Sequence, residues 1–229
     1  MQKAETIKKE TISQAGNIPL VLPGDYKANN PAIIDRIHSD LSDWQSKYPH
    51  YLLIGSVGSG KTYLASLILE SFKTRLCDLS QSLYSQCVKI DADNHREALN
   101  HNSLLRSYAQ QLNEYISSIK MITARSLHRH YLDHDNKIPA IPKFFCLDDL
   151  GAEPDTQSAK ELMISIISAR YEAYKAAKSD LFIITTNLSS DDLSYRYGDR
   201  IVDRITEMCT IMKFKSHSFR QDRREIIEG

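Results

Sequence analysis

The segment from Tyr51 to Thr62 constrains the fold more than any other part of the chain. An apolar run, Tyr-Leu-Leu-Ile, leads directly into Gly-Ser-Val-Gly-Ser-Gly-Lys-Thr, and apolar residues at helical spacing follow. Glycine at positions 55, 58 and 60 permits backbone conformations that are closed to residues with side chains, so successive N–H groups can point inward at an anion. A strand, a glycine-rich loop and a helix in this order predict a phosphate-binding loop in an α/β fold.

The residues of this loop have distinct expected roles. Lys61 should reach the β- and γ-phosphates of a nucleotide, and Thr62 should give its hydroxyl to Mg²⁺. The helix that begins there directs the positive end of its dipole at the same phosphates. An ordinary glycine turn is the alternative interpretation. We therefore expect ATP and Mg²⁺ as cofactors, with the nucleotide bound by Gly55, Ser56, Val57, Gly58, Ser59, Gly60, Lys61, Thr62 and Tyr63.

The composition indicates a globular protein. With 229 residues, 41% of them hydrophobic, the chain suits one α/β domain with modest additions. It has neither a run of about 20 apolar residues nor a signal-peptide core, so we expect a cytoplasmic location and no membrane partner. Four scattered cysteines without a C-x-x-C pair argue against a zinc ribbon or a disulfide framework. Lys plus Arg and Asp plus Glu number 29 each, so any binding to nucleic acid must be local or built by oligomerisation.

Hydrophobic periodicity predicts one helix before the phosphate loop and another after it, but the region that follows is ambiguous. Two short apolar stretches, Cys87–Asp91 and Ile119–Thr123, can each form the second strand. We favour Ile119–Thr123. This choice makes residues 74–117 a mainly helical insertion with one apolar face.

A later apolar strand, Phe144–Leu150, ends in the acidic pair Asp148-Asp149. A carboxylate at the carboxyl end of a parallel strand can lie beside the phosphate loop of a neighbouring strand, where open α/β sheets bind ligands. Asp148 would then hold the metal through its water shell, and Asp149 would orient and deprotonate the attacking water. A turn with two solvated acids is the alternative. Because the Lys61 loop occurs in the same chain, we interpret the pair as the second half of an ATPase site.

Three further polar residues follow this strand. Asn187 closes a predicted strand at residues 181–185, and its amide can fix the lytic water between the γ-phosphate and Asp149. Asparagine at the end of a strand is also a common turn residue. Arg200 and Arg204, four residues apart on a predicted helix, share a stripe that is typical of a surface.

Arg125 and Arg129 belong to a basic turn that follows the favoured second strand. A solvated helix face explains such a turn, and a contact with single-stranded DNA explains it as well. The histidines at positions 128, 130 and 134 are a third possibility, as metal ligands. The residues alone leave these alternatives open.

The order of the motifs resembles that of the DnaC/DnaI-type AAA+ helicase loaders and their relatives, the IstB transposition ATPases. The resemblance covers about residues 18–221, which we expect to form the ATPase domain; residues 1–17 are expected to be a flexible arm and residues 222–229 a charged tail. Besides the phosphate loop, the shared motifs are Leu-Asp-Asp-Leu-Gly-Ala-Glu (147–153), Arg-Tyr-Glu (170–172), Thr-Thr-Asn-Leu (185–188), Tyr-Gly-Asp-Arg-Ile-Val-Asp-Arg-Ile (197–205) and Ser-Phe-Arg (218–220).

This resemblance implies an AAA+ core with a five-stranded parallel sheet in the order 5-1-4-3-2, helices on both faces and no full helical lid domain. It implies that Asn187 is the first sensor and Arg220 the second, and that Arg204 is an arginine finger with Arg200 beside it. It also implies ATP-dependent assembly of the chain with itself into a helical oligomer on single-stranded DNA. Several subunits could then align their basic turns along one strand, which would explain DNA binding by a neutral protein.

The resemblance leads to two main functional expectations. The first is a Mg²⁺-dependent ATPase, stimulated by single-stranded DNA, that loads a replicative helicase of the DnaB type, for a phage or a mobile element. The second is an IstB-like transposition ATPase that coats DNA and recruits a transposase. A nucleotide-dependent binding module without appreciable hydrolysis is a further alternative. Only about 17 residues precede Ile18, so we expect no separate N-terminal module to grip the helicase, and residues 74–117 could replace it.

Overall fold

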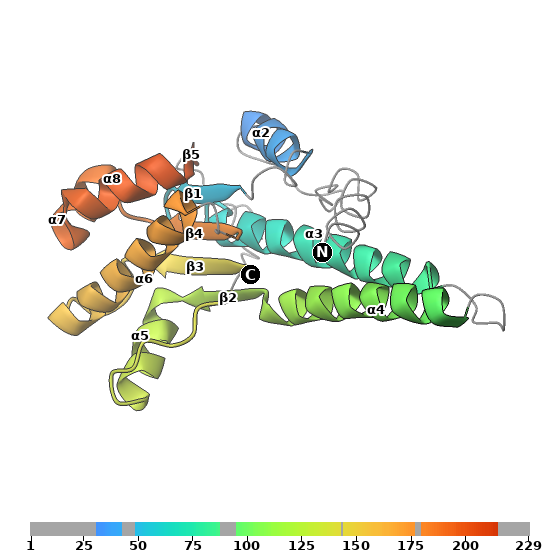
Figure 1. The fold of residues 1–229 in the computed structure, drawn as a ribbon. Helices are drawn as coiled ribbons and strands as arrows, with labels where there is room; N and C mark the ends of the chain where they lie inside the picture. Colours follow the sequence, from blue (N-terminus) through green and yellow to red (C-terminus); the bar gives the residue numbers. More distant parts are fainter. Residues whose placement is uncertain (1–30, 43–48, 88–94, 143, 177–179, 215–229) are drawn as a thin grey trace, which may run out of the picture.

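The computed structural model describes residues 31–42, 49–87, 95–142, 144–176 and 180–214 (Figure 1). The expected N-terminal arm, Arg220 and the charged tail lie outside these residues. The described elements are α2 (Pro31–Ser42), β1 (His50–Ile54), α3 (Lys61–Ser85), α4 (His95–Ser118), β2 (Lys120–Thr123), α5 (Ala124–Asp133), β3 (Phe145–Leu150), α6 (Gln157–Lys175), β4 (Phe182–Thr186), α7 (Ser190–Tyr197), α8 (Asp199–Met208) and β5 (Thr210–Lys213).

The strands form one parallel sheet in the order β2-β3-β4-β1-β5. Read from the other edge this is 5-1-4-3-2, so the expected order is confirmed. In the register, Ile54 pairs with Thr186 and Thr123 pairs with Asp148. Because all strands run in one direction, their carboxyl ends meet at a single edge of the sheet, and polar residues there come together.

Both faces of the sheet are covered at the central strands, because successive residues of a strand point to opposite faces and nearly all residues of β1, β3 and β4 are buried. Tyr51 and Leu53 pack with α2 and α3 in one core cluster, whereas Leu52 belongs to a second cluster with α6, α7 and α8. Phe144 likewise belongs to the first cluster and Phe145 to the second. This alternation explains why the sheet carries helices on both sides (Figure 1).

The helices α3 and α4 lie side by side and extend well beyond the strands (Figure 1). Helix α3 runs without interruption from the phosphate loop to Ser85. The described part of the region expected to be a helical insertion therefore consists of the distal turns of α3 together with α4. Ser80 Oγ donates to Asn113 Oδ1 at 3.0 Å, and Leu83 packs with Leu105 between the two helices. None of the described helices is both long and apolar enough to cross a membrane.

The ambiguity about the second strand is resolved by β2, which lies at Lys120–Thr123 and pairs with β3. The favoured interpretation is therefore confirmed. Most of the alternative stretch, residues 88–91, lies outside the described residues. Thr123 ends β2 and caps α5 at once, because its side chain accepts a hydrogen bond from Ser126 N. The basic turn consequently begins directly at the carboxyl edge of the sheet.

Candidate nucleotide-binding site

The phosphate loop connects β1 to α3 at the carboxyl edge of the sheet. Gly60 has φ 94°, a left-handed conformation that glycine adopts without strain, and it lies at the N-cap of α3. Gly60 makes no side-chain cap hydrogen bond, so the first N–H groups of α3 and the positive end of its dipole face the loop. Ser59 is buried, whereas Val57 and Tyr63 are exposed. This arrangement is that of an anion-binding turn.

Lys61 is 4% exposed and lies against the inside of the loop. Its Nζ donates to Gly55 O at 2.7 Å, to Ser56 O at 2.8 Å and to Asn187 Oδ1 at 2.8 Å. Burial lowers the pKa of Lys61, while the nearby charges of Asp149 and Asp148 oppose that shift. The oxygens around Nζ hold the cation where phosphate oxygens could replace them.

Thr62 and Asp148 supply oxygens at one point of the site. Thr62 Oγ1 donates to Asp148 Oδ1 at 2.9 Å, and Asp148 is buried at 5% exposure. A hydroxyl and a carboxylate are the oxygen donors that Mg²⁺ prefers in nucleotide sites. The donor chemistry of these two residues therefore fits the expected metal.

Asp149 departs from the strand geometry of β3. Its φ is +53°, and the pairing of β3 with β4 shifts register between Leu147 and Leu150. This irregularity lets the two adjacent carboxylates escape the alternation that would send them to opposite faces of the sheet. Asp148 and Asp149 both act electrostatically on Lys61, so the structure brings the acidic pair and the phosphate loop together.

Thr185 forms a hydrogen bond with each residue of the acidic pair. Its Oγ1 donates to Asp148 Oδ1 at 2.6 Å and accepts from Asp149 N at 2.9 Å. The next residue, Thr186, donates from Oγ1 to Leu150 O at 2.7 Å. The sequence pattern placed Thr185 at the end of a strand and in the Thr-Thr-Asn-Leu motif but did not predict this contact. The signal was a threonine two residues before Asn187, near the carboxyl end of a strand that adjoins the acidic one.

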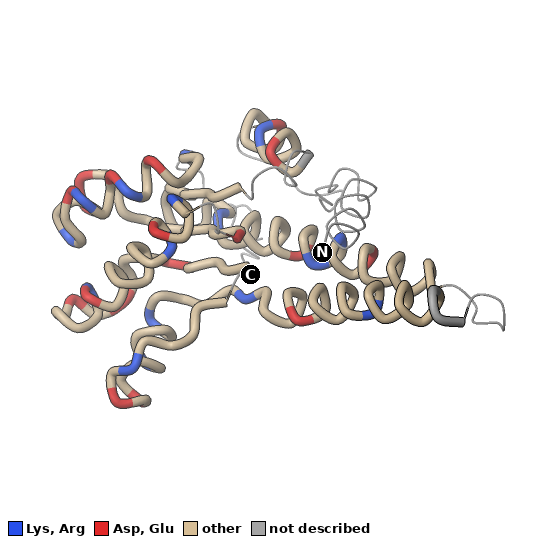
Figure 2. Tube along the Cα trace, in the orientation of Figure 1, with Lys and Arg blue, Asp and Glu red and all other residues tan. Residues whose placement is uncertain are grey.

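Among the residues that the structure describes, Arg204 contacts helix α6 and not the phosphate loop of its own chain. Its Nη1 donates to Ser168 Oγ at 2.6 Å, its Nη2 lies 3.4 Å from Glu172, and its guanidinium lies over the ring of Tyr171. These partners belong to α6. Arg200, one turn earlier on α8, is exposed. Figure 2 shows that Lys and Arg alternate with Asp and Glu along α7 and α8, so the surface is of mixed charge rather than basic.

Arg125 and Arg129 are both exposed on α5. Arg125 donates from Nε and from Nη2 to Ala152 O, at 3.2 Å each, and so contacts the loop that follows the acidic pair. His128 is buried and lies 3.3 Å from Ser158 Oγ through Nε2. Within the part of the chain that the structure describes, no group of three His, Cys, Asp or Glu residues could hold a metal ion.

Comparisons with known proteins agree with this geometry. The family described as "Nephrocystin 3, N-terminal" matches residues 36–164, which include the phosphate loop and the acidic pair. The family described as "IstB-like ATP binding protein" matches residues 122–226. No curated protein matches the sequence at a significant level.

Two solved structures share the fold. A crystal structure of the DnaC helicase loader has 22% identity and a TM-score of 0.55, and the match covers 87% of this chain and 97% of that one. A structure of AMPPCP-bound DnaA from Aquifex aeolicus has 15% identity and a TM-score of 0.51, over 86% of this chain. The chain spans only 50% of that DnaA chain.

Proposed function

The chain belongs to the family described as Nephrocystin 3, N-terminal, through residues 36–164, and it is an AAA+ ATPase of the DnaC/IstB-like type; on this basis we propose that it is an ATP-dependent helicase loader. The observation that carries the proposal is the constellation in which Lys61 contacts Asn187 while Thr62 contacts Asp148. In this proposal Lys61 is the phosphate-binding cation, Thr62 and Asp148 are the metal-binding pair, and Asn187 is the sensor, and the two contacts support their joint action.

In the proposed reaction, water attacks the γ-phosphorus of ATP and the bond to the β–γ bridging oxygen breaks. Lys61 exchanges its carbonyl partners for β- and γ-phosphate oxygens, and Asn187, once released from Lys61, orients the attacking water. Asp149 accepts the proton of that water. Thr62 and Asp148 would hold Mg²⁺, which neutralises charge on the phosphates when bound.

The proposed site is completed by a neighbouring subunit. Arg204 and Arg200 lie on α8, and Arg200 is exposed where it could reach another chain. Tyr195 on the adjoining α7 is 93% exposed, so this surface also offers an aromatic side chain to a partner. We assign Arg204 as the finger that acts on the neighbour's γ-phosphate, with Arg200 beside it, and Arg220 as the second sensor.

Single-stranded DNA is the proposed activator of the ATPase. Arg125 and Arg129 are exposed on α5, and Arg125 contacts the Ala152 carbonyl in the loop that follows Asp149. One subunit neutralises few phosphates, so useful affinity requires a row of subunits held together by ATP. DNA bound by Arg125 would then be linked to Asp149 through Ala152, whose carbonyl contacts Arg125 and whose N–H donates to Asp149 O.

Helicase loading is favoured over DNA coating for transposition because the chain matches the DnaC loader over 97% of that structure. The IstB-like match over residues 122–226 favours the alternative, recruitment of a transposase. Affinity capture with the full chain as bait, in ATP and single-stranded DNA, separates the two. Recovery of a replicative helicase of the DnaB type supports the loader, and recovery of a transposase supports the alternative.

A turnover assay tests the proposal against a binding module that does not hydrolyse ATP. We expect hydrolysis that requires Mg²⁺ and rises when single-stranded DNA is added. Assembly on DNA with ATP but without turnover would instead favour the binding module.

A further inference from the structure

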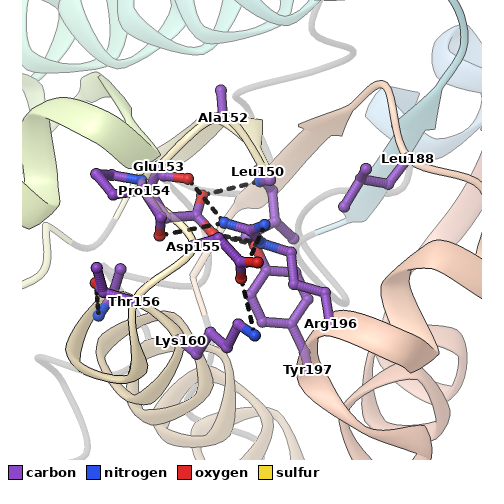
Figure 3. A network of polar contacts seen from close by, with 12 residues as sticks. Leu150, Ala152, Glu153, Pro154, Asp155, Thr156, Lys160, Leu188, Arg196 and Tyr197 are labelled. Atoms are coloured by element: carbon purple, nitrogen blue, oxygen red, sulfur yellow. Dashed lines mark hydrogen bonds and ion pairs between the residues drawn. The ribbon is translucent and has the colours of Figure 1, made fainter.

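We propose that Glu153 is a positioning residue that couples Asp149 to the helices α7 and α8, an inference that rests on the proposed function. Through this carboxylate, docking of α8 on a neighbouring subunit would set the orientation of Asp149 in the same chain. Figure 3 shows the contacts involved: Arg196 and Tyr197 reach from α7 to the loop that contains Glu153. Residues 149–156, which comprise the last two residues of β3 and the loop that follows, are called the 149–156 loop below.

The Glu153 carboxylate is fully buried, with 0% of its side chain exposed. Its Oε2 accepts from Gly151 N at 2.9 Å, and its Oε1 accepts from Arg196 Nε at 3.1 Å and from the Tyr197 hydroxyl. A buried charge must be paired, yet a buried ion pair adds little stability compared with apolar side chains of the same size. Because the Glu153 carboxylate is fully paired yet adds little stability, we infer that its role is to hold the geometry of the 149–156 loop.

The first donor connects Glu153 to Asp149. Gly151 lies two residues after Asp149, and Ala152 N donates to Asp149 O at 2.9 Å, which closes a turn between them. Gly151 has φ +99°, and a Cβ there would lie 2.5 Å from Leu188 Cδ1, so any other residue would strain the backbone and displace Leu188. With Asp149 also at positive φ, the hydrogen bond on Gly151 N holds the backbone turn that begins at Asp149, and so bears on the orientation of its side chain.

The other donors connect Glu153 to α8. Arg196 Nη2 donates to Glu153 O at 2.7 Å, so Arg196 holds both the side chain and the backbone of that residue. Burial, together with the Glu153 carboxylate, raises the pKa of Tyr197 further above its ordinary value, and the neutral phenol donates to that carboxylate. Gly198 follows at once, ending α7 and serving as the N-cap of α8. A displacement of α8 would thus be transmitted to the 149–156 loop within a few residues.

The contacts of Arg196 continue past Glu153 to a more exposed part of the loop. Arg196 Nη1 lies 3.5 Å from Asp155 Oδ1, which is 2.8 Å from Lys160 Nζ on α6. Asp155 is 70% exposed, so this outer pair is screened by water and contributes little. The coupling consequently depends on the buried Glu153 carboxylate.

The first test compares Glu153→Gln with Glu114→Gln, an exposed residue on α4 that serves as the control. Glutamine keeps the shape but loses the charge that Arg196 and the two other donors share. We expect kcat for ATP hydrolysis to fall about tenfold in Glu153→Gln while the Kd for ATP stays unchanged. If Glu153→Gln does not fold, Tyr197→Phe removes one donor and keeps the ring, and kcat should fall in the same direction. An unchanged kcat in the folded variant overturns the inference.

The second test asks whether Glu153 acts through α8, by placing Glu153→Gln in an Arg204→Ala background and measuring single-turnover hydrolysis. If the neighbour's contact with α8 is already lost, Glu153→Gln should lower the rate further by less than about twofold. An equal loss in both backgrounds would show that Glu153 merely supports its own loop, and would overturn the coupling. An unchanged rate in Arg204→Ala alone contradicts the composite site of the proposed function, and the coupling fails with it.

Discussion

Asn187 Oδ1 accepts a hydrogen bond from Lys61 Nζ at 2.8 Å, across 126 residues of sequence. This contact joins the carboxyl end of β4 to the phosphate loop. Lys61 donates at the same time to two loop carbonyls, so the amide and the carbonyls share one cation. A phosphate that takes up Lys61 would free the Asn187 amide for another partner, which relates nucleotide binding directly to the position of the sensor.

Asn187→Ala should separate nucleotide binding from hydrolysis. We expect the Kd for ATP to change little, because phosphate oxygens replace the amide, whereas kcat should fall about 100-fold through loss of water positioning. Nucleotide titration and steady-state kinetics measure the two effects, with exposed Asn100→Ala on α4 as the control. A large rise in Kd with unchanged kcat would mean that the amide serves binding instead.

The two carboxylates should behave differently. Asp149→Asn is expected to retain ATP and Mg²⁺ and to lose hydrolysis, because the amide keeps the shape and removes the base. Asp148→Asn should weaken the Mg²⁺ dependence, since it alters a group that contacts Thr62. Magnesium titrations of both variants provide the measurement. If Asp149→Asn abolishes the Mg²⁺ dependence and Asp148→Asn leaves it intact, the two roles are reversed.

Thr185→Val should lower both stability and kcat. Thr185 is completely buried, and its hydroxyl serves Asp148 and the backbone N–H of Asp149 at once. Valine would leave that N–H without an acceptor, at a cost of about 1–3 kcal/mol in the free energy of unfolding. Denaturant unfolding and kcat measure the two effects, and exposed Thr74→Val on α3 is the control. Thr185→Ser should restore both, and a failure to do so would mean that the methyl group, not the hydroxyl, is needed.

DNA binding should depend on ATP and on the basic turn. Arg125→Ala/Arg129→Ala is expected to weaken binding of single-stranded DNA and to flatten its salt dependence, because each subunit releases fewer counterions. The matched control is Lys73→Ala/Arg106→Ala, which removes two positive charges from exposed sites on α3 and α4. Fluorescence anisotropy across a range of salt concentrations measures both. Equal affinity with and without ATP, or an unaltered salt slope in the double variant, would make the turn a solvated helix face.

Local patterns were sufficient to predict the phosphate loop, the acidic strand and the strand that precedes Asn187. The loop carries glycine, lysine and threonine at the fixed spacing of a phosphate-binding motif. Each strand is a run of apolar residues that is followed by a polar residue. The strand order came from the resemblance, since a sequence pattern does not state which parallel strands are neighbours. The length of α3 could not be predicted, because no glycine or proline marks an end between Lys61 and Ser85.

Contacts across elements were beyond the reach of these patterns. Thr185 meets the acidic pair only because β3 and β4 are adjacent and their register shifts after Leu147. Glu153 meets Arg196, 43 residues away, because α7 packs back over the 149–156 loop. Arg204 was predicted on a surface stripe, and its contacts with α6 follow from helix packing that the stripe does not encode.

The contacts of Arg204 with α6 require a control for any test of its proposed action on a neighbour. Removing the arginine also removes a hydrogen bond to Ser168 within the chain. Ser168→Ala deletes that bond and leaves the guanidinium in place. We expect Ser168→Ala to retain ATP hydrolysis, whereas Arg204→Ala should lose about 10³-fold in rate while still binding ATP. Equal losses in the two variants would assign Arg204 a structural role.

The most direct test of the composite site is to mix Arg204→Ala with Lys61→Ala subunits and to measure ATP hydrolysis on single-stranded DNA. Lys61→Ala should not bind ATP tightly, because it lacks the cation that faces the phosphates, so each variant alone should be inactive. In the mixture, interfaces that pair an intact Lys61 site with an intact Arg204 should form. We predict that activity recovers in proportion to such interfaces; no recovery at any mixing ratio would contradict a site shared between subunits.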